Sequence, residues 1–195
     1  MPAEGGTGRV FDFAVIYQEA SNWCWAAVAQ AVLSTMKHVN EQQEQVATAH
    51  LRASGRPDVC DAAHKHQSGG GSCSAEHCTK PCNAPHSIEA VLGERGIEAV
   101  SLPALLDDSI IKAEVQDDRP IVCRIRYQAG AHYVVIAGWI PYKNEIAFLI
   151  HDPLSKSRGP FVKTVWAARS ALTSYGYSLD GGPVGLCEES WRLRA

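Results

Sequence analysis

The sequence has no long hydrophobic run and no excess of basic charge. Of its 195 residues, 46% are hydrophobic and 20% are charged, and no stretch approaches the ~20 apolar residues that a membrane span needs. The net charge of −3 and the pI near 6.2 provide no basic stripe for a nucleic acid. Residues 1–9 lack the apolar core of a secretory signal, although this alone does not decide the localisation. We therefore expect neither a membrane nor a nucleic-acid partner.

The length fits one globular domain over residues 1–195, since a chain of this size can bury a sizeable core without splitting. The part from about 15 to 118 predicts helices, at 24–33, 41–51, 87–96 and 109–116. The part from about 119 to 195 predicts a sheet, with strands at 121–127, 132–139 and 146–150. Residues 173–195 have no clear period and are expected to form an edge strand or a tail. Helices followed by antiparallel strands indicate an α+β fold.

Neither glycine nor proline interrupts residues 25–33, five of which are alanine or leucine. A buried helix is therefore expected to begin at Cys24. The positive end of the peptide dipoles at a helix N-terminus favours the thiolate, which is the nucleophilic form of cysteine. The side-chain amide of Gln18 and the backbone N–H of Cys24 can both donate to the oxyanion that forms when a thiolate attacks a carbonyl. The segment predicts a nucleophile and its oxyanion hole.

A cysteine nucleophile needs a base and a group that orients the base. Of the eight histidines, only His132 opens an apolar run with the composition of a buried strand. The next apolar run ends at Asp152, just before Pro153, which cannot continue a strand ladder. If the two strands pair as a hairpin through residues 141–144, His132 and Asp152 become neighbours. The sequence thus predicts His132 as general base and acid and Asp152 as its orienting partner.

Each of these residues also has an ordinary structural interpretation, and His151 competes with His132 for the role of base. A single buried cysteine or histidine is more often a core residue than a catalytic one. The joint order of Gln18, Cys24, His132 and Asp152 favours catalysis. Alternation along a strand places His151 on the face opposite Asp152, so His132 is preferred.

The segment from Gln18 to Ala27 reads Gln-x-x-x-x-Trp-Cys-Trp-Ala-Ala. Together with His132 and Asp152 it resembles the papain-like cysteine peptidases, and within them a bacterial branch of short single-domain enzymes, secreted effectors and bacteriocin-processing peptidases. The resemblance covers most of residues 15–172. It implies a papain-like fold, with a central nucleophile helix in an N-terminal helical part that packs on a C-terminal antiparallel sheet. It also implies a Cys24–His132–Asp152 triad, with Gln18 as oxyanion donor.

The chain departs from the plant and animal enzymes around the nucleophile. Those enzymes carry Cys-Gly-Ser-Cys-Trp, whereas this chain has Ser-Asn-Trp-Cys-Trp at residues 21–25. The first cysteine of their local disulfide is therefore missing. The orienting residue is usually Asn in papain-type enzymes, and Asp in the bacterial branch. Of Trp23 and Trp25, we expect one to pack beneath the active site, and core packing or the substrate cleft for the other.

Residues 54–86 form a long loop, rich in glycine and proline, that cannot be ordered by a core of its own. With Cys123 and Cys187, its cysteines make an even number that allows three disulfides, which indicates an oxidising compartment, although Cys123, in the middle of a strand, is alternatively a free core residue. Alternatively, the loop cysteines bind zinc, although their spacing fits no standard finger. The loop cysteines are Cys60, Cys73, Cys78 and Cys82, and the nearby histidines are His64, His66, His77 and His86. We favour disulfides, since proteins that resemble this one carry paired cysteines ahead of a Cys-Asn-x-Pro segment such as residues 82–85, and we assign no pairs.

These features predict a cysteine peptidase that hydrolyses peptide or isopeptide bonds through a thioester, without a cofactor. We expect a monomer that acts on a protein or peptide and is secreted or translocated, as the resemblance to effectors implies. One alternative is an acyltransferase or amidase of the same fold, because an amine in place of water turns the thioester into a new amide. The other is a cysteine-stapled, non-catalytic interaction module, against which the intact catalytic residue types argue.

Overall fold

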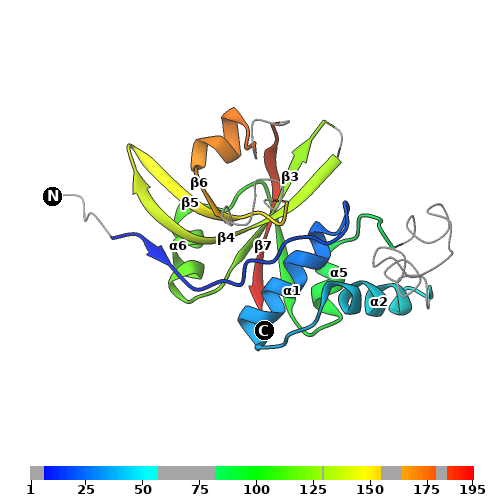
Figure 1. Cartoon of the computed structure of the whole chain (residues 1–195). Coiled ribbons are helices and arrows are strands. Elements are labelled where there is room, and N and C mark those ends of the chain that lie inside the picture. Colours follow the sequence, from blue (N-terminus) through cyan, green and yellow to red (C-terminus); the bar gives the residue numbers. More distant parts are fainter. Residues whose placement is uncertain (1–6, 57–81, 129, 155–163, 179–183) are drawn as a thin grey trace.

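Helices α1 (Cys24–Lys37), α2 (Gln43–Ala53) and α5 (Ile88–Gly93) lie together beside a single antiparallel sheet, and α6 (Asp108–Gln116) lies apart from them (Figure 1). The computed structural model of the protein describes residues 7–56, 82–128, 130–154, 164–178 and 184–195. The chain also contains a π-helical turn η2 (Ala171–Tyr175). The strands are β1 (Arg9–Val10), β2 (Glu98–Pro103), β3 (Ile121–Tyr127), β4 (Gly130–Tyr142), β5 (Glu145–His151), β6 (Thr164–Ala168) and β7 (Leu186–Arg194). In the described part of the chain, no helix is long and apolar enough to span a membrane.

The predicted helix at Cys24 is confirmed, and it lies at the centre of the molecule (Figure 1). Every residue of α1 from Cys24 to Leu33 is buried. The helix packs against β4 of the sheet and against α2 and α5. A helix that is apolar on all sides can only be accommodated between such layers. The first turn of α1 is thereby fixed at the junction of the helical part and the sheet.

The predicted hairpin is also confirmed, with a tighter turn than expected. Strands β4 and β5 pair antiparallel with Tyr142 opposite Glu145, so only Lys143 and Asn144 form the turn. Lys143 has a φ of 50°, which a two-residue hairpin turn requires. The register brings Val135 opposite His151, so the beginning of β4 lies near the residues that follow β5.

The sheet contains four strands that the sequence analysis did not place, namely β1, β2, β6 and β7. Its order is β2-β7-β3-β4-β5-β6, with β1 paired to β4. The C-terminal strand β7 lies between β2 and β3, so the expectation of an edge strand or a tail for this stretch is wrong. Strand β2 comes from the part expected to be helical. Its residues are mostly exposed, so they carry little of the apolar pattern that predicts a strand.

The C-terminal strand is held in place by packing and by charge. Trp191 of β7 is buried, and its ring lies 5.6 Å from that of Tyr133 on β4. Glu114 of α6, only 1% exposed, accepts hydrogen bonds from Arg119, Arg192 and Arg194. The hydrogen bond from Arg194, then those from the other two arginines, lower the pKa of Glu114 to about 2 against the opposing effect of burial. These contacts explain how a strand without clear periodicity occupies the inside of the sheet.

Candidate active site

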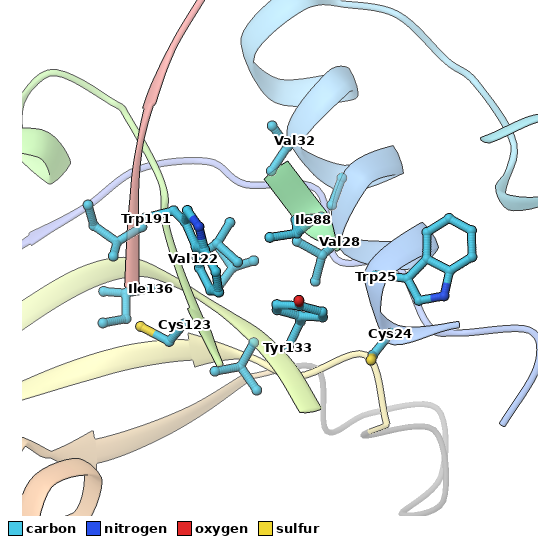
Figure 2. Close-up of a cluster of buried hydrophobic side chains, with 14 of the residues drawn as sticks. Cys24, Trp25, Val28, Val32, Ile88, Val122, Cys123, Tyr133, Ile136 and Trp191 are labelled. Atoms are coloured by element: carbon cyan, nitrogen blue, oxygen red, sulfur yellow. The ribbon is translucent and has the colours of Figure 1, made fainter. Parts of the chain in front are cut away.

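Cys24 is the first residue of α1 and is 8% exposed. Its thiol is free. Trp23 at the N-cap makes no side-chain hydrogen bond to the helix, and the first turn holds no acidic residue. The backbone N–H groups of this turn are therefore not capped by a side chain, and their dipoles favour negative charge at the sulfur. Figure 2 shows Cys24 at the end of the helix ribbon, with Tyr133 on the side of the buried cluster.

His132 lies on β4 between Asp152 and Cys24. Its Nε2 is 2.7 Å from Oδ1 of Asp152, and Cys24 as well as Asp152 raises the pKa of its ring. Because Nε2 is used by Asp152, Nδ1 is the ring atom left for the sulfur. The side chains of His132 and Asp152 are 8% and 1% exposed. The structure thus brings together three residues that are distant in the chain: His132 follows Cys24 by 108 positions, and Asp152 follows His132 by 20.

The environment of His132 favours the imidazolium. Burial by itself would lower its pKa, but the hydrogen bonds with Asp152 and Cys24, and the charges of both, raise the pKa of His132 from 6.5 to about 9. A histidine that stays protonated beside a cysteine stabilises the thiolate. The arrangement therefore places a histidine with a raised pKa beside the thiol of Cys24.

Asp152 has two further partners, one of which the sequence analysis missed. Its Oδ1 also accepts the backbone N–H of Leu154 at 2.9 Å, and its Oδ2 accepts the hydroxyl of Tyr177 at 3.1 Å. Tyr177 is 2% exposed and is fixed by a backbone bridge to Gly185. No local pattern around Tyr177 marks this role, because the bridge that places it joins residues outside any predicted strand.

Gln18 lies in the segment before α1, with its side chain turned toward its own loop. Its Nε2 donates to the carbonyls of Ala20 (2.9 Å) and Ser21 (2.8 Å), so both amide hydrogens have acceptors. Its backbone N–H donates to the carbonyl of Pro153 at 3.0 Å, which connects this loop to the residue after Asp152. Donation to an oxyanion requires one of the two side-chain hydrogens to leave its carbonyl.

His151 lies away from the dyad, as alternation along β5 predicts. Its ring packs edge-on against Phe13 with centroids 5.1 Å apart, and neither ring nitrogen has a hydrogen-bond partner in the described residues. Burial lowers the pKa of His151 to about 4, although the charge of Asp12 acts in the opposite direction. His151 is therefore a neutral core residue.

Trp23 and Trp25 are both buried, at 1% and 0% exposure. Trp25 points to the side of α1 away from Tyr133 (Figure 2), and its ring packs on those of His50 and His86. Core packing is thus the outcome for both tryptophans.

Cys123 and Cys187 have free thiols, so the three-disulfide arrangement that includes them is not the one in the structure. Cys82 is disulfide-bonded, whereas Cys60, Cys73 and Cys78 lie outside the described residues, so the pairing within the loop stays a prediction. Within the described ranges, no group of three or more His, Cys, Asp or Glu side chains is arranged to hold a metal ion.

His86, named among the candidate zinc ligands, has a different neighbour. Its Nδ1 is 3.1 Å from Nε2 of His50, whose Nδ1 is 2.7 Å from a carboxylate oxygen of Glu94. Burial, then the charges of His50 and Arg56, lower the pKa of His86 to about 4.

Comparison with solved structures finds chains of similar fold. A structure of the mite allergens Blo t 1 and Der p 1 matches with a TM-score of 0.53 and 13% identity, covering 100% of this chain and 73% of that one. The peptidase domain of Streptococcus ComA matches with a TM-score of 0.48 and 15% identity, covering 93% and 98%. Digestive procathepsin L 3 of Tenebrio molitor matches with a TM-score of 0.48 and 11% identity, covering 96% and 70%. A comparison with curated proteins finds no match.

The α+β fold with its central helix is that of a papain-like cysteine peptidase, and the predicted fold class is confirmed. More particularly, the chain belongs to the Peptidase_C39 like family, whose profile matches residues 10–178. The protein is therefore a hydrolase of the papain-like cysteine peptidases, as the sequence predicts.

Proposed function

We propose that the protein cleaves peptide or isopeptide bonds with a Cys24–His132–Asp152 triad through a thioester intermediate. The observation that carries the proposal is the position of His132, which is hydrogen bonded to Asp152 and whose pKa is also raised by Cys24. A base that is oriented by one group and faces a nucleophile is the geometry that activates a thiol.

The reaction begins with transfer of the Cys24 proton to His132. The thiolate attacks the carbonyl carbon, a C–S bond forms, and the carbonyl oxygen becomes an oxyanion. His132 then gives its proton to the leaving amine as the C–N bond breaks, which leaves a thioester on Cys24. Water, deprotonated by His132, hydrolyses the thioester and restores the thiol. No cofactor takes part in these steps.

The oxyanion is held in this proposal by the Cys24 backbone N–H and the Gln18 amide. The uncapped first turn of α1 supports the first donor. For the second, one hydrogen of Gln18 Nε2 must exchange its acceptor, Ala20 or Ser21, for the oxyanion. The short segment between Gln18 and Cys24 keeps both donors next to the nucleophile.

A peptide-library cleavage assay with the wild type and Cys24→Ala tests the proposal. Cleavage is expected from the wild type, and the variant is expected to lose about 10⁴-fold or more of kcat/KM. Iodoacetamide is expected to alkylate Cys24, which has His132 beside it, faster than Cys187 and faster than Cys123, whose pKa is raised by its hydrogen bond with Cys187 and by burial. Equal cleavage by the two proteins, or alkylation that prefers Cys123 or Cys187, would contradict the triad.

The same assay separates hydrolysis from acyl transfer. Products are analysed by mass spectrometry with and without an added primary amine. A free carboxylate in both conditions supports a hydrolase that acts on peptides, whereas an amide formed only with the amine identifies the acyltransferase alternative.

A further inference from the structure

The end of the cysteine-rich segment contacts the loop that carries the nucleophile. Asn83 accepts the backbone N–H of Asn22 through Oδ1 (2.8 Å) and donates Nδ2 to Oγ of Ser21 (2.7 Å). Its backbone carbonyl accepts Nδ2 of Asn22 at 2.7 Å. Asn83 thus makes three hydrogen bonds to two adjacent residues that lie about sixty positions earlier in the chain.

Two tryptophans extend these contacts on either side of Asn83. Nε1 of Trp23 donates to the carbonyl of Cys82 (2.8 Å), and Nε1 of Trp25 donates to the carbonyl of Ala84 (3.0 Å). Both indole rings are buried, so these N–H groups need a protein partner. The segment of residues 21–25, which carries Cys24, is therefore hydrogen bonded to residues 82–84.

The residues that Asn83 holds are connected to the proposed oxyanion donors. The carbonyl of Ser21 accepts a hydrogen bond from Gln18 Nε2, and α1 begins at Cys24, two residues after Asn22. A shift of Ser21 or Asn22 therefore moves both donors relative to the sulfur. We propose that Asn83 is a positioning residue that fixes the Ser21–Cys24 loop so that both donors reach the oxyanion.

This inference rests on the proposed function, and it accounts for two features of the sequence that the triad leaves unexplained. Three positions before the nucleophile, where the plant and animal enzymes have a cysteine, this chain has Ser21, whose hydroxyl accepts the hydrogen bond from Asn83. The Cys-Asn-x-Pro segment at residues 82–85 supplies the asparagine. Hydrogen bonds thus fasten the loop at the position where the first cysteine is missing.

The amide side chain is required because it accepts and donates at the same time. Asn83→Asp keeps the bond from the Asn22 N–H and removes the donation to Ser21, so that contact survives only if the Ser21 hydroxyl turns to donate to the carboxylate, whereas Asn83→Ala loses both bonds. Ser21→Ala removes the same donation from the other end. These three substitutions separate the two side-chain hydrogen bonds without touching Cys24, His132 or Gln18.

The experiment measures kcat and KM for a cleaved peptide, the rate of Cys24 alkylation by iodoacetamide, and inhibition by a peptide aldehyde. Alkylation needs the thiolate but no oxyanion hole, whereas the aldehyde forms a hemithioacetal whose oxygen lies in the hole. Asn83→Ala is expected to lower kcat about 10- to 100-fold and weaken aldehyde inhibition by a similar factor. KM and the alkylation rate are expected to change by less than about threefold, since the Cys24–His132 pair is intact.

Asn83→Asp and Ser21→Ala are expected to give a smaller loss of kcat, about 3- to 10-fold, and their double variant no more than the larger single loss, because they break one shared bond. Asn144→Ala, in the exposed β4–β5 turn, is the matched control and is expected to behave as the wild type. Circular dichroism checks folding. If Asn83→Ala does not fold, the two milder variants decide.

A kcat of Asn83→Ala within twofold of wild type would overturn the inference, and so would a parallel loss of alkylation and turnover, which is the signature of general damage. Failure of the proposed function looks different, because the wild type would then cleave nothing or Cys24→Ala would cleave equally well. Aldehyde binding needs no turnover, so it tests the positioning role even without a good peptide substrate.

Discussion

Nε2 of His132 lies 2.7 Å from Oδ1 of Asp152, across the end of the β4–β5 hairpin. The two residues are twenty positions apart, and the antiparallel register of the hairpin makes them neighbours. The second oxygen of the same carboxylate is held by Tyr177, and the second nitrogen of the same imidazole is left for Cys24. Each group therefore has one partner that orients it and one on which it acts.

The activity is expected to have an alkaline limb set by the Cys24–His132 pair. The pKa of His132 is raised to about 9, so the imidazolium that donates to the leaving amine is lost as the pH rises through about 9. A pH profile of kcat/KM measures this limb. Asp152→Ala removes a hydrogen bond and a charge that raise this pKa, so the limb is expected to move to lower pH and kcat/KM to fall about 100-fold. An unchanged limb in Asp152→Ala would contradict the role of this carboxylate.

Tyr177→Phe is expected to lower kcat about fivefold, which corresponds to the loss of about 1 kcal/mol from one hydrogen bond to Asp152. The ring and its packing are kept, so the variant changes only the partner of the carboxylate. Tyr175→Phe is the matched control, because Tyr175 is 82% exposed. Steady-state kinetics of both variants provide the measurement, and equal kcat values for the two would show that the Tyr177 hydroxyl has no part in catalysis.

The folded protein is expected to lose stability as the pH falls from about 6.5 to about 4. His151 is buried and its folded-state pKa is lowered to about 4, whereas in the unfolded chain the value is 6.5. The unfolded state therefore binds more protons in this window, and the stabilisation present above pH 6.5 decreases by up to about 3 kcal/mol. Urea unfolding at pH 7 and pH 4.5 measures the difference.

His151→Phe is expected to reduce this pH dependence, because the substituted side chain cannot be protonated and the site already packs on Phe13. Activity at pH 7 is expected to stay near the wild-type value, since His151 lies outside the dyad. If the variant shows the full loss of stability on acidification, other groups carry the effect.

Glu114→Gln is expected to lower the free energy of unfolding by about 3 kcal/mol, because it removes the charge that is shared by Arg119, Arg192 and Arg194. Asp118→Asn is the control. Its ion pair with Arg9 lies at the surface, where such pairs contribute about 0–1 kcal/mol. Thermal or denaturant unfolding of the two variants compares them, and similar losses would show that the buried carboxylate is not the feature that fastens β7.

The sequence predicts those parts of the site that local chemistry encodes. The helix at Cys24 follows from a run without glycine or proline, and the proximity of His132 and Asp152 follows from two strands joined by a short turn. The position of His151 away from Asp152 follows from alternation along the strand. In each case a short-range rule of backbone geometry decides the outcome.

The parts that the sequence does not predict depend on pairs that are distant in the chain. Strand β7 lies between β2 and β3 because Trp191 packs on Tyr133 and because Arg192 and Arg194 meet Glu114. Tyr177 reaches Asp152 through a bridge to Gly185, and Asn83 reaches Ser21 across about sixty residues. No periodicity marks such contacts, since a hydrogen bond between distant side chains leaves no local pattern.

The sequence by itself therefore determined which groups meet at this site, namely a thiol at a helix start, a histidine and a carboxylate. Only the tertiary structure decided which partners hold the side chains of these groups in place. It supplied Tyr177 beneath Asp152, Asn83 beside the nucleophile loop, and the acceptors Ala20 and Ser21 for Gln18. The physical reason is that a residue type fixes which bonds a side chain is able to make, whereas the packing of the whole chain fixes which partners lie within reach.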